Sequence, residues 1–212
     1  MGLEILSKHL DGLILFKPKV FGDSRGFFYE SFKDSEFKDL RINVEFVQDN
    51  HSKSAKNVLR GMHFQWEKPQ GKLLRVVKGA CLFVELDIRK NSPNLGKHEK
   101  FELNEDNKHI LWVPPGFANS FLTLEDNTEV LYKCTAEWNP EAESGIRWND
   151  PELNIDWGVK NPELSEKDRN AQTLNEWLNK KESNNFLIQY YEKNIFNIFT
   201  FTNFIFLYYC KI

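Results

Sequence analysis

A chain of 212 residues fits one medium-sized domain, or one domain with an appendage. Since 41% of the residues are hydrophobic and 28% are charged, the chain can fill a core, and general disorder is excluded. The formal net charge of −3 provides no overall electrostatic footprint for nucleic acid, although a local basic pocket for a small anion stays open.

Short strand-like segments separated by turns dominate residues 10–150. About eight strands are expected, at 13–16, 27–32, 44–47, 73–77, 81–88, 110–113, 120–124 and 129–134. Glycine, proline, asparagine and aspartate mark the turns between them. Several of these segments are apolar with only partial alternation, as expected when both faces of a sheet are covered. The pattern predicts an all-β sandwich or barrel rather than βαβ units.

Helical signals are few. Residues 34–40 form one candidate, and the Ser165-Glu166-Lys167-Asp168 run is similar to a capping box. It precedes a helix expected over 170–181, in which Leu174, Trp177 and Leu178 share one face. We therefore expect a few short helices, one of them near the C-terminal end of the domain.

The composition changes after residue 182. Ten of the 30 aromatic residues lie between Ser183 and Ile212. The most apolar stretch, 195–209, is shorter than the roughly 20 residues that a membrane-spanning helix needs, so no membrane span is expected. We divide the chain into a domain over 1–181 and an aromatic-rich, non-catalytic tail over 182–212. A transmembrane role, packing at a subunit interface and an unordered tail without a function remain open for this tail.

Three widely spaced cysteines, Cys81, Cys134 and Cys210, form neither a CxxC motif nor a disulfide framework. The N-terminus contains Glu4, Lys8 and Asp11 before any long apolar run, unlike a signal peptide. Both observations favour the cytoplasm.

Polar and cationic side chains gather between residues 48 and 72. Gln48, Asn50, Arg60, His63 and Lys72 recur there beside strand-like residues, which is more polarity than a sandwich surface requires. From composition alone, His63 is equally well a general base or a hydrogen-bonded core histidine.

The order of the motifs resembles one family. The matching segments are Asp23-x-Arg25-Gly26-x-Phe28-x-Glu30, Gln48-Asp49-Asn50, Leu59-Arg60-Gly61-x-His63-x-Gln65, Gln70-Gly71-Lys72-Leu73, Pro114-Pro115-Gly116-Phe117-Ala118, Val130-Leu131-Tyr132-Lys133-Cys134, Trp148-Asn149-Asp150-Pro151, Ile155-Asp156-Trp157 and Leu164-Ser165-Glu166-Lys167-Asp168. Together they resemble the dTDP-4-dehydrorhamnose 3,5-epimerase family, in register from about Leu13 to Trp177.

The resemblance implies a cupin-type jelly roll (a double-stranded β-helix) that forms a homodimer. It also implies an isomerase that inverts C3, C5 or both in a nucleotide-diphospho-4-keto-6-deoxy sugar, most simply dTDP-4-dehydro-6-deoxyglucose, and needs no cofactor. Metal-binding cupins have an HxH pair and a later histidine, whereas this chain has His63-Phe64-Gln65 and Asn119 at those positions. With a single imidazole, no metal is expected.

By this resemblance His63 is the base, Asp168 orients it, Lys72 stabilises the enolate and Tyr132 is the acid on the opposite face. Histidine suits a general base near neutral pH, and a fixed cation suits a developing oxyanion. The residues expected to bind the substrate are Arg25, Phe28, Glu30, Gln48, Asp49, Asn50, Arg60, Asn119, Trp138, Glu143 and Lys167.

Three positions depart from the family pattern. Asn119 stands where a histidine is common, Phe83 where an aspartate is common, and Trp138 where a tyrosine is common. Glu85, two residues from Phe83 on the same strand face, can replace the missing carboxylate in part. These changes keep alternatives open: a 3-epimerase, an epimerase of another 4-keto sugar such as a GDP-linked heptose, a 3,4-ketoisomerase, or an inactive sugar-nucleotide-binding cupin.

Overall fold

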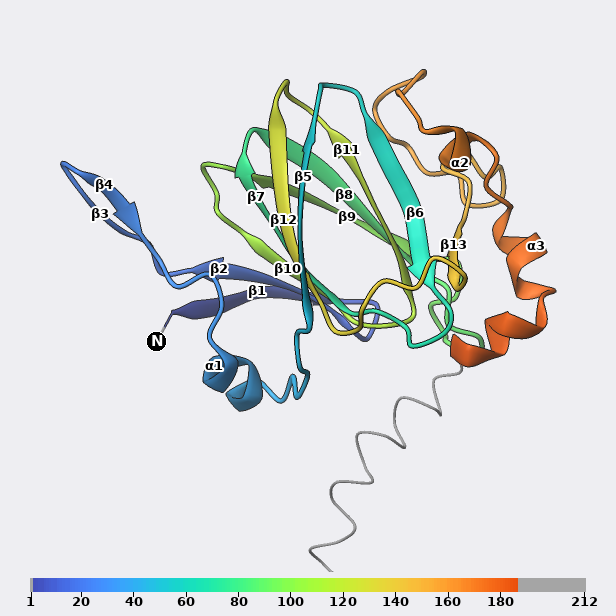
Figure 1. The fold of residues 1–212 in the computed structure, drawn as a ribbon, viewed down its shortest axis with the longest axis horizontal. Coiled ribbons are helices and arrows are strands. Elements are labelled where there is room, and N and C mark those ends of the chain that lie inside the picture. The colour runs from blue at the N-terminus through green and yellow to red at the C-terminus, as the bar shows by residue number, and fades with distance from the viewer. Residues whose placement is uncertain (1, 187–212) are drawn as a thin grey trace, which may run out of the picture.

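Two antiparallel β-sheets face each other (Figure 1) in the computed structural model, which describes residues 2–186. The first sheet has the order β1 (Leu3–His9), β2 (Leu13–Pro18), β10 (Ile110–Val113), β7 (Lys72–Lys78), β12 (Thr128–Cys134) and β5 (Gln48–Ser54). The second has the order β13 (Glu143–Gly145), β6 (Leu59–Gln65), β11 (Phe117–Thr123), β8 (Ala80–Asp87) and β9 (His98–Asn104). From β5 to β8, and again from β10 to β13, successive strands alternate between the sheets. This is the winding of a jelly roll, as predicted.

An apolar cluster packs between the two sheets. Phe83 and Phe121 meet there from β8 and β11, with ring centroids 5.4 Å apart. Leu74, Val76 and Val130 from the first sheet complete the packing, and Tyr132 lies against it. Residues that alternate with these along their strands therefore face outward, and residues in step with them face the interior.

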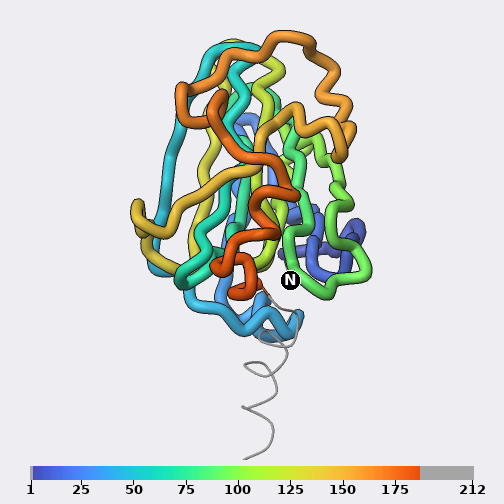
Figure 2. The backbone as a smooth tube through the Cα atoms, turned by 90° about the vertical axis from the view of Figure 1, so that its right-hand side faces the viewer, coloured from blue at the N-terminus to red at the C-terminus, as the bar shows by residue number. Residues whose placement is uncertain are grey.

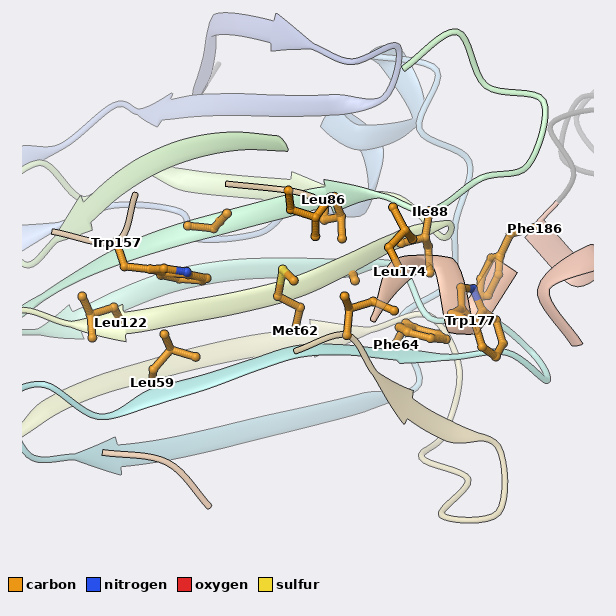
Figure 3. Close-up of a cluster of buried hydrophobic side chains, with 14 residues drawn as sticks. Leu59, Met62, Phe64, Leu86, Ile88, Leu122, Trp157, Leu174, Trp177 and Phe186 are labelled. Atoms are coloured by element: carbon orange, nitrogen blue, oxygen red, sulfur yellow. The ribbon is translucent and has the colours of Figure 1, made fainter. Parts of the chain in front are cut away.

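The C-terminal segment covers the outer face of the second sheet (Figure 2). It contains α2 (Glu166–Arg169), α3 (Leu174–Leu178) and a 3₁₀ helix, η1 (Lys181–Phe186). Figure 3 shows Trp177 and Phe186 beside Phe64 of β6; the ring centroid of Phe64 lies 4.6 Å from that of Trp177 and 5.8 Å from that of Phe186. Residues 182–186, which the sequence assigns to the tail, thus pack onto the domain. The rest of the tail lies outside the described residues.

The outer face of the first sheet is covered at one end by α1 (Asp34–Asp39), close to the predicted helix at 34–40. Phe37 of this helix is 1% exposed and packs on Phe16 of β2. Among the described residues no helix is long and apolar enough to cross a membrane.

A separate hairpin leaves the body of the domain between β2 and α1 (Figure 1). It consists of β3 (Phe21–Asp23) and β4 (Gly26–Phe28), and no other strand in the described part of the chain pairs with it. The predicted strand at 27–32 was therefore wrong beyond residue 28.

The predicted helix over 170–181 is also interrupted. Gln172 forms a β-bridge with Ile146, and Thr173 begins α3 with a complete capping box to Glu176. Within the predicted range only α3 is α-helical, η1 begins at its last residue, and α2 ends before the range begins.

Candidate active site

An irregularity in β6 turns His63 toward the interior. Arg60 pairs with Phe121 and His63 pairs with Asn119, so β6 contains one more residue than β11 between these pairs, which is a β-bulge. Both partners on β11 face the interior, and Arg60 and His63 therefore share that face although three positions separate them. Met62 and Phe64 point into the outer cluster instead. The bulge is what makes the Arg60-Gly61-x-His63 motif present two polar side chains to one site.

His63 forms the shortest polar contact of the site with Asp168. Its Nε2 lies 2.5 Å from Oδ1 of Asp168, which is 3% exposed in α2. Burial raises the pKa of Asp168, but hydrogen bonds from His63, the Ser165 hydroxyl and the Gly61 N–H outweigh it, and the net pKa is lowered. Because the carboxylate is ionised, Nε2 carries the ring proton and donates a hydrogen bond to Oδ1 of Asp168. Nδ1 is then the nitrogen free to accept a proton.

Tyr132 and Lys72 face the interior from the opposite sheet. Tyr132 pairs with Leu74, and Lys72 with Cys134, on neighbouring strands β12 and β7. Desolvation raises the pKa of Tyr132, so its phenol stays protonated and can act as an acid. Desolvation lowers the pKa of Lys72, while the nearby charges of Cys134, Glu85 and Glu143 act in the opposite direction.

A chain of hydrogen bonds joins five of the expected substrate-binding residues at the edge of the site. The Gln48 amide accepts a hydrogen bond from the Trp138 backbone at 2.8 Å and donates to Asn50 at 3.0 Å. The Trp138 indole donates to Glu143 at 3.2 Å, and the Lys167 ammonium lies 2.6 Å from the same carboxylate oxygen. Glu143 interacts electrostatically with His63, Tyr132 and Lys72, so this network lies beside these three side chains.

Three further expected residues take different positions. Arg60 is exposed, donates to the Ser54 hydroxyl at 3.1 Å and lies within electrostatic range of Tyr132. Asn119 is 8% exposed between His63 and Glu85. Asp49 alternates with Gln48 and Asn50 along β5, so it lies on the other face of the strand. Its carboxylate contacts Lys133 at 3.0 Å and does not join the others.

Arg25, Phe28 and Glu30 are not brought to the site within one chain. Arg25 and Phe28 lie on the outlying hairpin, and Glu30 follows it (Figure 1). The guanidinium of Arg25 contacts Asp23 at 2.6 Å with its side chain 88% exposed, and the Phe28 residue is 66% exposed. Glu30 lies 3.9 Å from Lys33.

Sequence reasoning missed two supporting residues. Ser165 was interpreted only as a helix cap, but its hydroxyl also helps to keep Asp168 ionised. Gln65 is 3% exposed; its amide donates to the carbonyls of residues 67, 68 and 137 and accepts from the Asn139 N–H. It thereby holds the loop that carries Trp138. The capping signal was visible, whereas nothing in the sequence marks the partners of Gln65.

Within residues 2–186 no group of three or more His, Cys, Asp or Glu is arranged to hold a metal ion. A histidine–carboxylate pair that faces a protonated tyrosine and a lysine across a jelly roll defines an acid–base enzyme. The dTDP-4-dehydrorhamnose 3,5-epimerase model matches residues 7–176. The chain belongs to this family and is an isomerase, which confirms the resemblance of its motifs.

Individual relatives agree with this assignment. The chain is 46% identical over 176 residues to the dTDP-4-dehydrorhamnose 3,5-epimerase of Methanothermobacter thermautotrophicus, covering 82% of this chain and 95% of that protein. The crystal structure of the dTDP-6-deoxy-D-glucose-3,5-epimerase of Legionella pneumophila, in complex with dTDP-4-keto-L-rhamnose, superposes with a TM-score of 0.81 at 42% identity, covering 85% of this chain and 96% of that one. ChmJ of Streptomyces bikiniensis, a 3'-monoepimerase in complex with dTDP-quinovose, gives a TM-score of 0.78 at 29% identity, covering 87% and 93%.

Proposed function

We propose that this enzyme converts dTDP-4-dehydro-6-deoxyglucose to dTDP-4-dehydrorhamnose by inverting C3 and C5. The observation that carries the proposal is the ionised Asp168 oriented on His63, opposite the protonated Tyr132. Base and acid belong to different sheets, so they approach a sugar ring held between the sheets from its two faces. Inversion at carbon requires this arrangement.

Each inversion moves one proton off carbon and one onto it. Nδ1 of His63 removes the proton next to the C4 ketone, and the C–H electrons move to the C4 oxygen to form an enolate. The ammonium of Lys72 stabilises that oxygen; one such donor in a preorganised site contributes about 3–4 kcal/mol. Tyr132 then donates its proton to the opposite face of the same carbon. Proton exchange with water resets His63 and Tyr132, so no oxidant or reductant is consumed.

Asp168 has an orienting part in this proposal. It fixes the tautomer of His63 and stabilises the imidazolium that forms when the proton is abstracted, as a carboxylate does for the histidine of a catalytic triad. The rim network of Gln48, Trp138, Glu143 and Lys167 supports binding of the sugar and diphosphate, since it offers both donors and an ammonium group beside the dyad.

We further propose that the enzyme is a homodimer in which the hairpin of one protomer reaches the site of the other. The outlying position of Arg25 and Phe28, together with the exposure of Phe21 at 54% and Phe27 at 62%, supports this. An arginine fork suits diphosphate and a phenylalanine ring suits a base. Mixing Arg25→Ala protomers with His63→Ala protomers tests this. Restored turnover in the mixture supports shared sites, and a mixture as inactive as the two separate variants contradicts them.

The described cysteines, Cys81 and Cys134, are free buried thiols, which supports a reducing compartment such as the cytoplasm. The proposed catalytic domain ends before the aromatic-rich tail. All four proposed catalytic groups lie within residues 63–168, which supports a non-catalytic role for the tail.

Solvent exchange tests the reaction. In D2O with dTDP-4-dehydro-6-deoxyglucose, deuterium should enter both C3 and C5 of the product, and His63→Ala should abolish both. Binding without exchange at either carbon would instead indicate an inactive sugar-nucleotide-binding protein.

A second candidate is inversion at C3 alone. Asn119, Phe83 and Trp138 depart from the common pattern inside the sugar pocket, and the chain also resembles a 3'-monoepimerase over 87% of its length. Exchange confined to C3 in the same experiment would select this function.

A further inference from the structure

Glu85 is a buried carboxyl group without a partner. It is 0% exposed in β8, and neither of its oxygens has a hydrogen-bond partner among the described residues. Asn119, which pairs with it on β11, is 8% exposed, and its Oδ1 is also without a partner there. Buried polar groups are hydrogen-bonded in the great majority of folded proteins. Two adjacent exceptions on one face of a sheet call for a ligand or water.

The position of Glu85 connects it with the reaction. Glu85 lies in step with Phe83 along β8, and Phe83 belongs to the interior cluster, so both side chains face the space between the sheets. His63, Asn119 and Glu85 follow one another across β6, β11 and β8. Lys72 lies within electrostatic range of Glu85 from the opposite sheet. The carboxyl group therefore continues the row of polar groups that begins at the base.

Burial also shifts the ionisation of this carboxyl group toward its protonated form. Desolvation raises the pKa of Glu85 well above its ordinary value, and the charge of Lys72 lowers it only in part. A protonated carboxyl offers one donor and one acceptor, and the Oδ1 of Asn119 offers a second acceptor. This set matches a hydroxyl group, which both donates and accepts. The unpartnered acceptor oxygens of Glu85 and Asn119 disfavour an anion in the same place.

We propose that Glu85, together with Asn119, hydrogen-bonds a ring hydroxyl of the sugar at the inner end of the barrel and so determines which sugar is accepted. The inference rests on the proposed function for the kind of ligand. A site that hydrogen-bonds a hydroxyl rejects the corresponding deoxy sugar strongly, because the protein groups are then left buried and unpaired.

Binding measurements test this independently of turnover. We would compare wild type with Glu85→Met, which keeps the volume but removes the polar atoms, and with Glu85→Gln, which keeps a donor and an acceptor. The probes are dTDP, dTDP-glucose and its 2-deoxy and 3-deoxy analogues, measured by calorimetry. Glu99→Gln is the matched control: Glu99 pairs with Glu85 across β9 but its side chain is 36% exposed and contacts His9 at 3.4 Å.

Glu85→Met should weaken the binding of dTDP-glucose at least tenfold, equivalent to about 1.4 kcal/mol, and leave the affinity for dTDP unchanged. With one of the two deoxy analogues, Glu85→Met and wild type should bind equally, which identifies the hydroxyl. Glu85→Gln should retain most of the affinity, and Glu99→Gln all of it. Unliganded Glu85→Met should be at least as thermostable as wild type, since it removes an unpaired buried carboxyl.

Equal weakening of all three sugar nucleotides, or no weakening of any, would overturn the role of Glu85. So would an equal loss for dTDP, which would indicate general structural damage. Deuterium exchange with the keto sugar is measured separately. If deuterium exchange occurs but Glu85→Met binds dTDP-glucose as tightly as wild type does, the role of Glu85 is rejected and the proposed reaction stands. If Glu85→Met weakens binding of dTDP-glucose selectively but no exchange occurs, only the proposed reaction is rejected.

Discussion

Gly61 lies directly against Ser120 of the neighbouring strand. A Cβ atom on Gly61 would come within 2.3 Å of the Cβ of Ser120 and 2.8 Å of the Asn119 carbonyl oxygen, and the residue has a φ of +129°. No other residue type fits here without moving β11 away from β6. Because His63 follows in the same bulge, this contact fixes the position of its side chain relative to Asn119.

Gly61→Ala should therefore lower both stability and activity. We expect about 1–2 kcal/mol from the unfavourable φ and a further 1–3 kcal/mol from overpacking. Gly26→Ala is the control, because Gly26 has a φ of +131° with nothing within 4 Å. Urea denaturation should show the larger loss for Gly61→Ala; equal losses would mean that the contact with Ser120 carries no cost.

Asp168→Asn should reduce kcat by roughly 10²–10⁴-fold, since the amide neither fixes the required tautomer of His63 nor stabilises its imidazolium. The carboxylate is 3% exposed, and Oδ1 lies 2.5 Å from Nε2 of His63. Glu166→Gln, an exposed change in the same short helix, should keep normal turnover. Steady-state kinetics at neutral pH would decide, and near-normal kcat in Asp168→Asn would remove the orienting role.

Tyr132→Phe should separate proton exchange from inversion. His63 can still remove a proton and return it to the same face, but no acid remains on the other face. Mass spectrometry in D2O should detect deuterium in recovered substrate while NMR detects little epimer. Tyr29→Phe, which removes a hydroxyl that accepts from Arg75 at 3.3 Å, should behave as wild type. Normal inversion in Tyr132→Phe would assign the acid to another group.

Glu85→Gln should change how stability depends on pH. The folded-state pKa of Glu85 is raised, so below the unfolded pKa of about 4.3 the group is protonated in both states. As pH rises from there toward the folded pKa, only the unfolded state ionises, and wild-type stability falls by up to about 1.4 kcal/mol per pH unit. Lys72, the charged group facing Glu85, reduces this range. The Tm of Glu85→Gln relative to wild type should rise as the pH increases above about 4.3; a constant difference would mean that Glu85 is ionised when folded.

Truncation should distinguish two candidate C-terminal boundaries of the domain, Phe186 and Lys181. A chain ending at Phe186 should keep the stability and activity of the full chain, if the aromatic-rich tail is non-catalytic. A chain ending at Lys181 also loses Ser183 and Phe186, which are 0% and 1% exposed. Removing a buried phenylalanine typically costs 3–5 kcal/mol, so its Tm should be clearly lower. Equal Tm values would show that η1 adds nothing to the core.

Strands with apolar residues on both faces were predicted well. The range 110–113 matches β10 at both ends, and 129–134 differs from β12 by one residue. β5, β6 and β9 were not among the predicted strands, and β5 and β9 are polar along much of their length. Sheet neighbours, not their own composition, hold these polar strands in place. Tertiary pairing of that kind leaves no local signal.

In the candidate site, too, features that local motifs carry could be predicted, and features that depend on tertiary packing could not. Motif order proposed His63, Asp168, Lys72 and Tyr132; the structure brings His63 against Asp168 and turns Lys72 and Tyr132 inward from the other sheet. It could not show that Asp49 lies on the opposite face of β5, because face depends on strand register. Nor could it show that both oxygens of Glu85 are without partners, since that depends on every element packed around β8.

The pair formed by His63 and Asp168 joins residues 105 positions apart, one in a central strand and one in the segment that wraps the sheet from outside. A fragment ending before α2 would contain the other three proposed catalytic groups yet lack the carboxylate. In the proposed mechanism, detachment of that segment would leave His63 without the carboxylate that orients it, while both sheets remain intact. We therefore expect turnover to depend on docking of the segment that carries α2, and to be lost on heating before the two sheets unfold.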